Sequence, residues 1–233
     1  MTKLAPFAHQ GRLVAGRRIL ITGASSGIGR ALAEAFLVDG AAVAVCARRG
    51  PLLETLCPKM SKFRADVAEP ADVDGLIRGV EAALGGLDAV INNAGVLEAG
   101  RLTEQPLEQW SRTLDVNLTG PLLVARAASR LMKRGCVVNV TSGLGFFPME
   151  PYHAYCVSKA GLNMLTRALA AEWEGRIAVN AVDPGTARTA MNPSAEDEPA
   201  GVYPVVRALV AAGADGPTGR CFKKSGEEAP WAV

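Results

Sequence analysis

RILITGASSGIGRALAEAFLVDG, residues 18–40, consists of an apolar run, a glycine-rich turn and an amphipathic segment in direct succession. The apolar residues 18–23 are β-rich, which predicts a buried strand. Ile28, Leu32 and Phe36 then recur at helical spacing, which predicts a helix that begins at the turn. A helix N-terminus offers unpaired N–H groups and partial positive charge, so the unit is suited to bind a pyrophosphate.

The turn carries Gly23, Gly27 and Gly29 in the spacing G-x-x-x-G-x-G. Glycines allow a sharp turn and a close approach of the backbone to a ligand. The spacing differs from the commonest dinucleotide fingerprint, and the turn lacks the G-K-[ST] ending of a nucleotide-hydrolysing P-loop. A purely structural turn is the alternative, but the position between strand and helix favours cofactor binding.

Strand and helix patterns continue to alternate along the chain. The strands are continuously apolar, as expected when helices cover both faces of a parallel sheet. We therefore expect an α/β fold, a Rossmann-type doubly wound parallel sheet, as a single domain over residues 1–233. Residues 192–217 are expected to form a short loop and one helix on the substrate side. The other strands are expected at 42–47, 62–67, 87–95, 136–142 and 177–185, and the other helices at 73–86, 107–134 and about 154–174.

The composition excludes several classes of protein. The chain has 233 residues, of which 49% are hydrophobic, and its formal net charge is +2, too small to indicate nucleic acid or an acidic membrane as the main partner. No apolar run approaches the ~20 residues of a transmembrane helix, and the first 16 residues lack the features of a secretory peptide. Five scattered cysteines without a CxxC pair suit reduced thiols, and His9 and His153 are too isolated to hold a metal. We expect a cytoplasmic protein with no metal.

A possible chemical centre lies in YHAYCVSKAG, residues 152–161. In a helix, Tyr155 and Lys159 share one face, whereas Tyr152 has Cys156 at that spacing and no cationic partner. A nearby ammonium favours the phenolate, so we expect Lys159 to lower the pKa of Tyr155 toward the working range of a general acid or base. Taken alone, this spacing is a common coincidence, and a solvated helical pair is its more frequent meaning.

Six motifs occur together in a fixed order: TGASSGIG (22–29), NNAG (92–95), VNLTG (116–120), NVTSG (139–143), YCVSK (155–159) and VNAVDPGTARTAM (179–191). Together they resemble the short-chain dehydrogenase/reductase family over residues 17–191. The resemblance implies an oxidoreductase that moves a hydride between a nicotinamide cofactor and a ketone or aldehyde and its alcohol. The protein in such a reaction supplies orientation and electrostatics.

The resemblance assigns four catalytic roles. Tyr155 would exchange the proton with the substrate oxygen, and Lys159 would bind the nicotinamide ribose hydroxyls and keep Tyr155 poised. Ser142 would hydrogen-bond the substrate oxygen and stabilise its developing charge. Asn117 would hold a water that links Lys159 to solvent, although a polar residue that kinks a helix is the alternative.

The resemblance also implies the cofactor contacts. Asp66 would contact the adenine, unless it only caps a helix. The expected cofactor-binding residues are Gly23, Ser25, Ser26, Gly27, Ile28, Gly29, Arg48, Arg49, Asp66, Val67, Asn93, Ala94, Gly95, Tyr155, Lys159, Pro184, Gly185, Thr186 and Thr189.

The end of the second strand, VCARRG, indicates which cofactor is used. NAD-preferring relatives carry an acidic residue there that hydrogen-bonds the ribose hydroxyls. Here Ala47 takes that position and Arg48 and Arg49 follow, and a guanidinium can bind the 2′-phosphate of NADP. We therefore expect NADP(H) to be preferred over NAD(H), with Arg48 as the better candidate; two solvated arginines in a turn are the alternative.

The substrate side departs from the family pattern, because the region after Thr189 is short and the C-terminal residues RCFKKSGEEAPW match only a carbonyl-reductase-like subgroup, and weakly. An apolar carbonyl compound is expected, although each apolar candidate could equally be core. The candidates for the substrate pocket are Val96, Leu97, Phe146, Phe147, Met149, Tyr152 and Met191.

The segment 107–134 is more apolar than one sheet face needs, with Trp110, Leu114, Leu118, Leu122 and Leu123. Family members commonly pair through this helix and the one after Tyr155, so we expect a homodimer or homotetramer. Two other functions are the alternatives. A catalytically silent NADP(H)-binding regulator or scaffold would not need the four catalytic residues, and a Rossmann-like methyltransferase would not need the Tyr155 and Lys159 pair.

Overall fold

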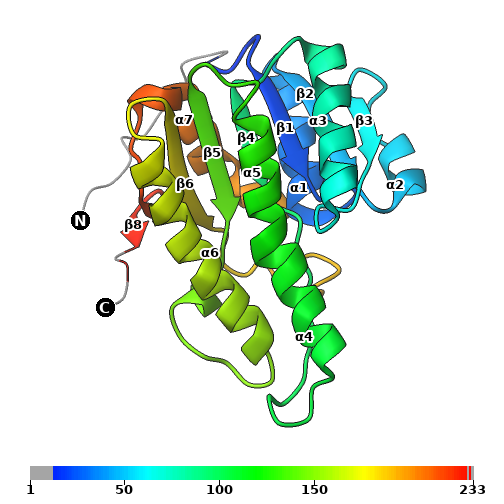
Figure 1. The fold of residues 1–233 in the computed structure, drawn as a ribbon, viewed down its shortest axis with the longest axis vertical. Helices are drawn as coiled ribbons and strands as arrows, with labels where there is room; N and C mark the ends of the chain where they lie inside the picture. Colours follow the sequence, from blue (N-terminus) through cyan, green and yellow to red (C-terminus); the bar gives the residue numbers. More distant parts are fainter. Residues whose placement is uncertain (1–12, 230, 232–233) are drawn as a thin grey trace.

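One eight-stranded sheet forms the centre of the molecule, and helices cover both of its faces (Figure 1). The structure is a computed structural model that describes residues 13–229 and 231; the N-terminal stretch with His9 lies outside these residues. The strand order is β3-β2-β1-β4-β5-β6-β7-β8, parallel throughout except for the antiparallel pair β7 and β8. The expected doubly wound α/β fold is therefore confirmed.

The strands are β1 (Arg18–Thr22), β2 (Ala42–Ala47), β3 (Ser61–Arg64), β4 (Ala89–Asn92), β5 (Gly135–Val140), β6 (Ile177–Asp183), β7 (Cys221–Lys223) and β8 (Glu228–Ala229). The α-helices are α1 (Gly27–Val38), α2 (Gly50–Glu54), α3 (Pro70–Leu84), α4 (Leu107–Leu114), α5 (Gly120–Ala128), α6 (His153–Glu172) and α7 (Tyr203–Ala212). Among these residues, no helix combines the length and the apolar character that crossing a membrane requires.

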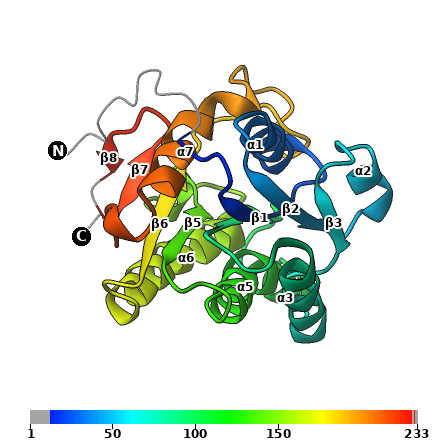
Figure 2. The same cartoon turned by 90° about the horizontal axis from the view of Figure 1, so that it is seen from above.

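Each face of the sheet has its own hydrophobic core. On one face, α1 and α7 pack their buried residues, including Phe36 and Val206, against the strands. On the other face, α3, α5 and α6 do the same with Val80, Val124 and Leu169. Figure 2 shows the two layers, with α1 and α7 on one side of the sheet and α3, α5 and α6 on the other. Burial on both faces explains why the strands are continuously apolar.

The helix expected over 107–134 is shorter and is interrupted. It forms α4, one π-helical turn and α5, and it ends at Ala128. Pro121 has no N–H to donate to the carbonyl of Asn117 four residues earlier, which favours the wider turn. After Ala128 the chain turns into β5, and the buried side chain of Met132 fixes this turn in the core.

Two further bounds differ from the sequence patterns. The strand expected over 62–67 ends at Arg64, because Asp66 forms a turn in which its Oδ1 accepts the N–H of Ala68 at 3.1 Å. The segment 192–217 forms the expected loop and helix α7, but the hairpin of β7 and β8 that follows was not expected.

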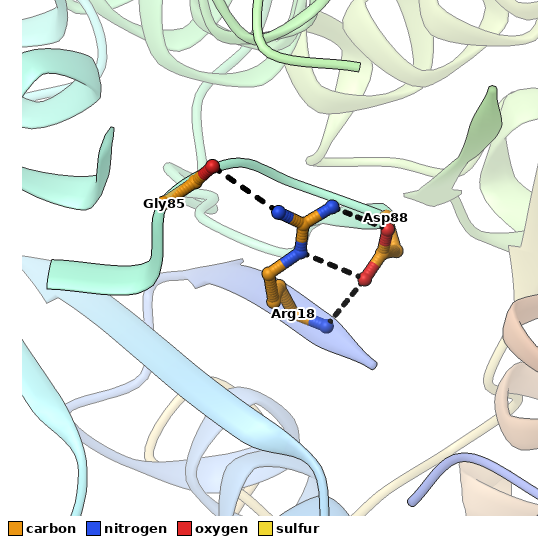
Figure 3. Close-up of polar contacts among 3 residues, drawn as sticks. All are labelled: Arg18, Gly85 and Asp88. Atoms are coloured by element: carbon orange, nitrogen blue, oxygen red, sulfur yellow. Dashed lines mark hydrogen bonds and ion pairs between the residues drawn. The ribbon is translucent and has the colours of Figure 1, made fainter. Parts of the chain in front are cut away.

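The amino ends of β1 and β4 are joined by one polar cluster (Figure 3). The N–H and Nε of Arg18 donate to Asp88 Oδ2 at 2.9 and 3.1 Å, and Nη2 donates to Oδ1 at 2.8 Å. Its Nη1 donates to the carbonyl of Gly85 at 3.2 Å. These hydrogen bonds from Arg18, opposed by burial, hold the pKa of Asp88 below its usual range. The cluster fixes the amino ends of these two strands, on the side of the sheet opposite the carboxyl ends.

Asp88→Asn is expected to lower the free energy of unfolding by about 1–3 kcal/mol, because it removes charge-assisted hydrogen bonds. A carboxyl with a folded-state pKa below the unfolded value contributes stability above about pH 4 and loses it as the pH falls through the folded pKa. The variant should therefore lose stability near neutral pH but lose less on acidification than the wild type. Urea unfolding of both proteins, at neutral pH and at a pH below about 4, measures the difference in the free energy of unfolding.

Asp215→Asn is the matched control, because Asp215 pairs with Arg134 but its side chain is 85% exposed. It should change the free energy of unfolding by about 0.5 kcal/mol or less. If both variants lost equal stability, the cluster of Arg18 and Asp88 would have no special role.

Candidate active site

A cavity of about 550 Å³ opens at the carboxyl ends of the parallel strands. It lies where β1 and β4 are neighbours, which is the point at which the strand order reverses and at which doubly wound sheets bind ligands. The lining residues are Gly23, Ser25, Ser26, Gly27, Ile28, Cys46, Ala47, Arg48, Arg49, Ala65, Asp66, Val67, Asn93, Ala94, Gly95, Val116, Val140, Thr141, Tyr155, Lys159, Pro184, Thr189, Ala190 and Met191.

The glycine-rich turn forms one end of this cavity. Gly23 has φ 68°, and a Cβ added to it would lie 2.7 Å from Ala94 Cα, so only glycine fits. Gly27 has φ 56°, and an added Cβ would lie 3.0 Å from Thr189 Cγ2. Asn93 ties the turn to β4, because its Nδ2 donates to the carbonyl of Gly23 at 3.2 Å and to that of Thr22 at 2.9 Å.

Arginines line the cavity beside the turn. Arg49 Nη2 donates to Ser25 Oγ at 2.9 Å and to Ser26 Oγ at 2.7 Å, so this guanidinium lies against the glycine-rich turn. Arg48 Nη1 lies 3.9 Å from Asp66 Oδ2, and its side chain is 49% exposed. Ala47 is almost fully buried at the end of β2 and brings no carboxylate to this region. The end of the cavity near β2 is therefore suited to an anionic group.

Tyr155 lies at the other end, in the first turn of α6, and its side chain is buried. Burial raises the pKa of Tyr155 to about 12, which a hydrogen bond with Ser142 only partly offsets. The expectation that Lys159 lowers this pKa is therefore wrong for this structure. The spacing places both residues on one helix face, but burial of the phenol has the largest effect on its pKa. Tyr155 is therefore a neutral phenol at neutral pH.

Lys159 is also buried, with 4% of its surface exposed. Its Nζ donates to the carbonyl of Val140 at 2.8 Å and lies 5.5 Å from the centre of the Tyr155 ring. Burial lowers the pKa of Lys159 to about 8. The lysine is thus mostly an ammonium at neutral pH and loses its charge as the pH rises through about 8.

Asn117 lies in the π-helical turn next to Lys159 and is fully buried. Its Oδ1 accepts the N–H of Val96 at 2.8 Å, and its Nδ2 donates to the carbonyl of Val96 and to Ser158 Oγ. A Cβ added to Gly95 would lie 3.3 Å from Asn117 Oδ1 and 4.0 Å from Lys159 Nζ, so the two side chains approach the same backbone. Its side chain is therefore engaged in fixing Val96, and its role in a water relay stays a prediction.

Most expected site residues line the cavity, but five do not: Gly29, Asn117, Ser142, Gly185 and Thr186. Gly29 instead allows close packing, because an added Cβ would lie 2.4 Å from Asn93 Nδ2. Thr186 Oγ1 donates to Asp197 at 3.4 Å, away from the cavity.

Most of the seven apolar candidates for the substrate pocket do not line the cavity. Met191 is the one that lines the cavity. Phe146 packs on Trp231 near the C-terminus, with ring centroids 6.1 Å apart, so its role is core packing.

Sequence patterns missed several residues of the site. Val140 ends β5, Thr141 follows it directly, and both line the cavity; their position at a strand end was an available signal. Asn163 follows Lys159 by one helical turn, and its Oδ1 accepts a hydrogen bond from Thr141 at 2.6 Å. Arg112 hydrogen-bonds Asp66 across 46 residues, and nothing in the local sequence indicates it.

The residues fit a dinucleotide. A glycine cradle and two guanidinium groups lie at one end of the cavity, and Tyr155 and Lys159 lie at the other. No group of three His, Cys, Asp or Glu side chains suited to a metal ion is found among residues 13–229 and 231.

Sequences and structures of known proteins were compared with this chain, and they agree with a dinucleotide-binding site. Residues 17–200 match the profile of the family described as short chain dehydrogenase. The chain is 34% identical to D-threitol dehydrogenase of Mycolicibacterium smegmatis over 197 residues, which cover 80% of this chain and 76% of that protein. It is 35% identical to 2,5-dichloro-2,5-cyclohexadiene-1,4-diol dehydrogenase of Sphingobium indicum, over 94% of this chain and 89% of that protein. A short chain dehydrogenase from Burkholderia cenocepacia, solved in complex with NADP, superposes with a TM-score of 0.83 at 31% identity, covering 90% of this chain and 96% of that one.

Proposed function

The chain belongs to the short chain dehydrogenase family and is an oxidoreductase, and from this we propose that it transfers a hydride between NADP(H) and a ketone or aldehyde and its alcohol. One observation carries the proposal. Buried Tyr155, next to Ser142 and Lys159, lies at the end of the same cavity that begins at the glycine-rich turn. A cofactor that spans the cavity would therefore place its reactive ring beside a proton donor.

The residues have distinct roles in this proposal. The nicotinamide ring supplies or accepts the hydride when it is bound. Tyr155 donates its proton to the substrate oxygen during reduction, and its raised pKa keeps that proton in place until the oxygen becomes basic. Ser142 donates a hydrogen bond to the same oxygen and stabilises its developing charge. Lys159 holds the ribose hydroxyls, and Asn117 keeps the backbone at Val96 in place beside it.

Oxidation of NADPH with a panel of apolar ketones and aldehydes tests the function. We expect turnover with at least one member of the panel. Cofactor binding without turnover on a broad panel would instead support the silent regulator or scaffold, the second candidate. The complete set of Asn117, Ser142, Tyr155 and Lys159 favours the enzyme.

The preference for NADP(H) rests on the end of β2. Ala47 offers no carboxylate to hydrogen-bond a ribose diol or to repel a phosphate. Arg49 is already engaged by Ser25 and Ser26, whereas Arg48 is half exposed and has only a distant contact with Asp66. Arg48 is therefore the guanidinium that is free to bind the 2′-phosphate, and the solved relative in complex with NADP is consistent with this choice.

Ala47→Asp combined with Arg48→Ala is expected to shift the preference toward NAD(H). Losing a charge-assisted contact to the phosphate costs about 1.5–3 kcal/mol, or roughly one to two decades in NADP affinity. Comparing kcat/KM for the two cofactors in both proteins measures the shift. A wild type with equal values, or with a higher value for NADH, would show that the assignment is wrong.

We also propose that the chain forms a homodimer or homotetramer through α4, α5 and α6. Figure 1 shows α4, α5 and α6 side by side. Apolar side chains remain exposed on all three helices. They include Leu107 on α4, Leu122 on α5, and Val157 and Met164 on α6. Burying them against a second copy would also steady the helix that carries Tyr155.

Light scattering at micromolar concentration is expected to give a multiple of the chain mass, and Met164→Glu is expected to reduce it, because a carboxylate would be buried in the contact. Val38→Glu is the control, since Val38 is also apolar, is 85% exposed compared with 58% for Met164, and lies on α1, on the other face of the sheet. A wild-type monomer would refute the proposal.

Three further properties of the chain remain proposals. All described strands belong to one sheet, which supports a single domain over residues 1–233. A cytoplasmic location and an apolar substrate stay predictions.

A further inference from the structure

Arg112 of α4 contacts the cavity wall from outside, and the proposed reaction gives it no role. Its Nη2 donates to Asp66 Oδ2 at 2.6 Å, and Asp66 lines the cavity. Arg48 approaches the same oxygen only to 3.9 Å. One carboxylate oxygen thus faces two guanidinium groups, of which Arg112 alone is within hydrogen-bond distance.

Asp66 is held firmly in this arrangement. Its Oδ1 accepts the N–H of Ala68 at 3.1 Å, and its own N–H donates to Asp72 Oδ2 at 2.8 Å. Its side chain is 19% exposed, compared with 49% for Arg48. Burial opposes ionisation of Asp66, but the hydrogen bonds from Arg112 and Ala68 hold its pKa below the ordinary range. Asp66 is therefore an anion at neutral pH whose orientation does not depend on Arg48.

The two contacts of this carboxylate differ in strength. A charge-assisted hydrogen bond at 2.6 Å between partly buried groups is far stronger than a contact at 3.9 Å with a half-exposed guanidinium in high dielectric. The negative charge of Asp66 is satisfied mainly by Arg112. The positive charge of Arg48 consequently remains available toward the cavity.

We propose that Arg112 is a positioning residue that sets the cofactor preference, because it holds Asp66 and so leaves Arg48 free for the 2′-phosphate of NADP. The inference rests on the cofactor preference proposed above. Without Arg112, the nearest cation to the Asp66 carboxylate would be Arg48. An incoming phosphate would then meet a guanidinium that is already paired and a carboxylate that repels it.

The test measures the dissociation constants of NADPH and NADH by fluorescence titration. Arg112→Met is expected to weaken NADPH binding about tenfold, the size of a charge-assisted contact, and to change NADH binding by about twofold at most. Arg112→Lys restores the charge and should recover most of the difference. Arg126→Met, which removes an exposed charge from the neighbouring helix α5, should leave the ratio of the two constants unchanged.

A second variant isolates the route through Asp66. In the double variant Arg112→Met with Asp66→Asn, no carboxylate can pair with Arg48, so the NADPH to NADH ratio should return to about the wild-type value. Asp66→Asn alone should keep that ratio even if it weakens the binding of both cofactors. This single variant is measured instead if Arg112→Met does not fold. Equal losses for both cofactors in Arg112→Met, or no recovery in the double variant, would overturn the inference.

The two possible failures are distinguishable. A wild type that binds NADH as tightly as NADPH would reject the proposed cofactor preference and this inference with it. A wild type that prefers NADPH, together with an Arg112→Met variant of unchanged ratio, would reject only the role of Arg112.

Discussion

Tyr155→Phe is expected to lower kcat by about 10²–10⁴-fold while the fold and the affinity for the cofactor are kept. The change removes only the hydroxyl that exchanges a proton with the substrate oxygen. Because Tyr155 is buried in α6, phenylalanine fills the same space. Steady-state kinetics give the loss in kcat, and a titration with NADPH gives the affinity.

Tyr152→Phe is the matched control. It also removes a phenolic hydroxyl, but the residue four positions after Tyr152 is Cys156 and not a lysine. Tyr152 does not line the cavity, so this variant should keep most of its activity. A Tyr155→Phe variant with a rate near that of the wild type would end the mechanism proposed here.

Lys159→Met is expected to lose both rate and cofactor affinity, because one side chain has two roles. The loss of charge-assisted hydrogen bonds to the ribose should weaken cofactor binding by roughly one to two decades. In the wild type, the affinity should also fall as the pH rises through about 8, where Lys159 loses its proton. Methionine keeps the length of the buried stem, so the fold should persist.

The pH dependence separates this role from a structural one. The affinity of Lys159→Met for the cofactor should not change between about pH 7 and pH 9, because the titrating group is gone. If the variant kept the pH dependence of the wild type, another group would have to cause it, and Lys159 would not be the residue that binds the ribose.

Local patterns were sufficient for the parts of the fold that depend on neighbours in sequence. The apolar run before Gly23 and the helical spacing after Gly27 fix β1, the turn and α1 without help from distant residues. The four-residue spacing of Tyr155 and Lys159 likewise predicts a shared helix face. The same reasoning places the strand ends, and hence the cavity, at one edge of the sheet.

Properties that depend on burial and long-range packing could not be predicted in this way. The pKa of Tyr155 follows from its burial, which spacing along a helix does not report. The hydrogen bond of Arg112 with Asp66 and the packing of Phe146 on Trp231 join segments far apart in the chain. A phenylalanine beside a catalytic motif has the same sequence signal whether it faces a substrate or the core.

The most direct test of the central claim follows the hydride itself. NADPH that carries deuterium at the transferred position of the nicotinamide is incubated with the wild-type protein and a carbonyl compound that it reduces, and the product alcohol is analysed by mass spectrometry. We predict that the wild type places deuterium on the carbinol carbon and that Tyr155→Phe forms almost no labelled alcohol. An alcohol formed without the label, or labelled alcohol formed equally well by Tyr155→Phe, would contradict the account.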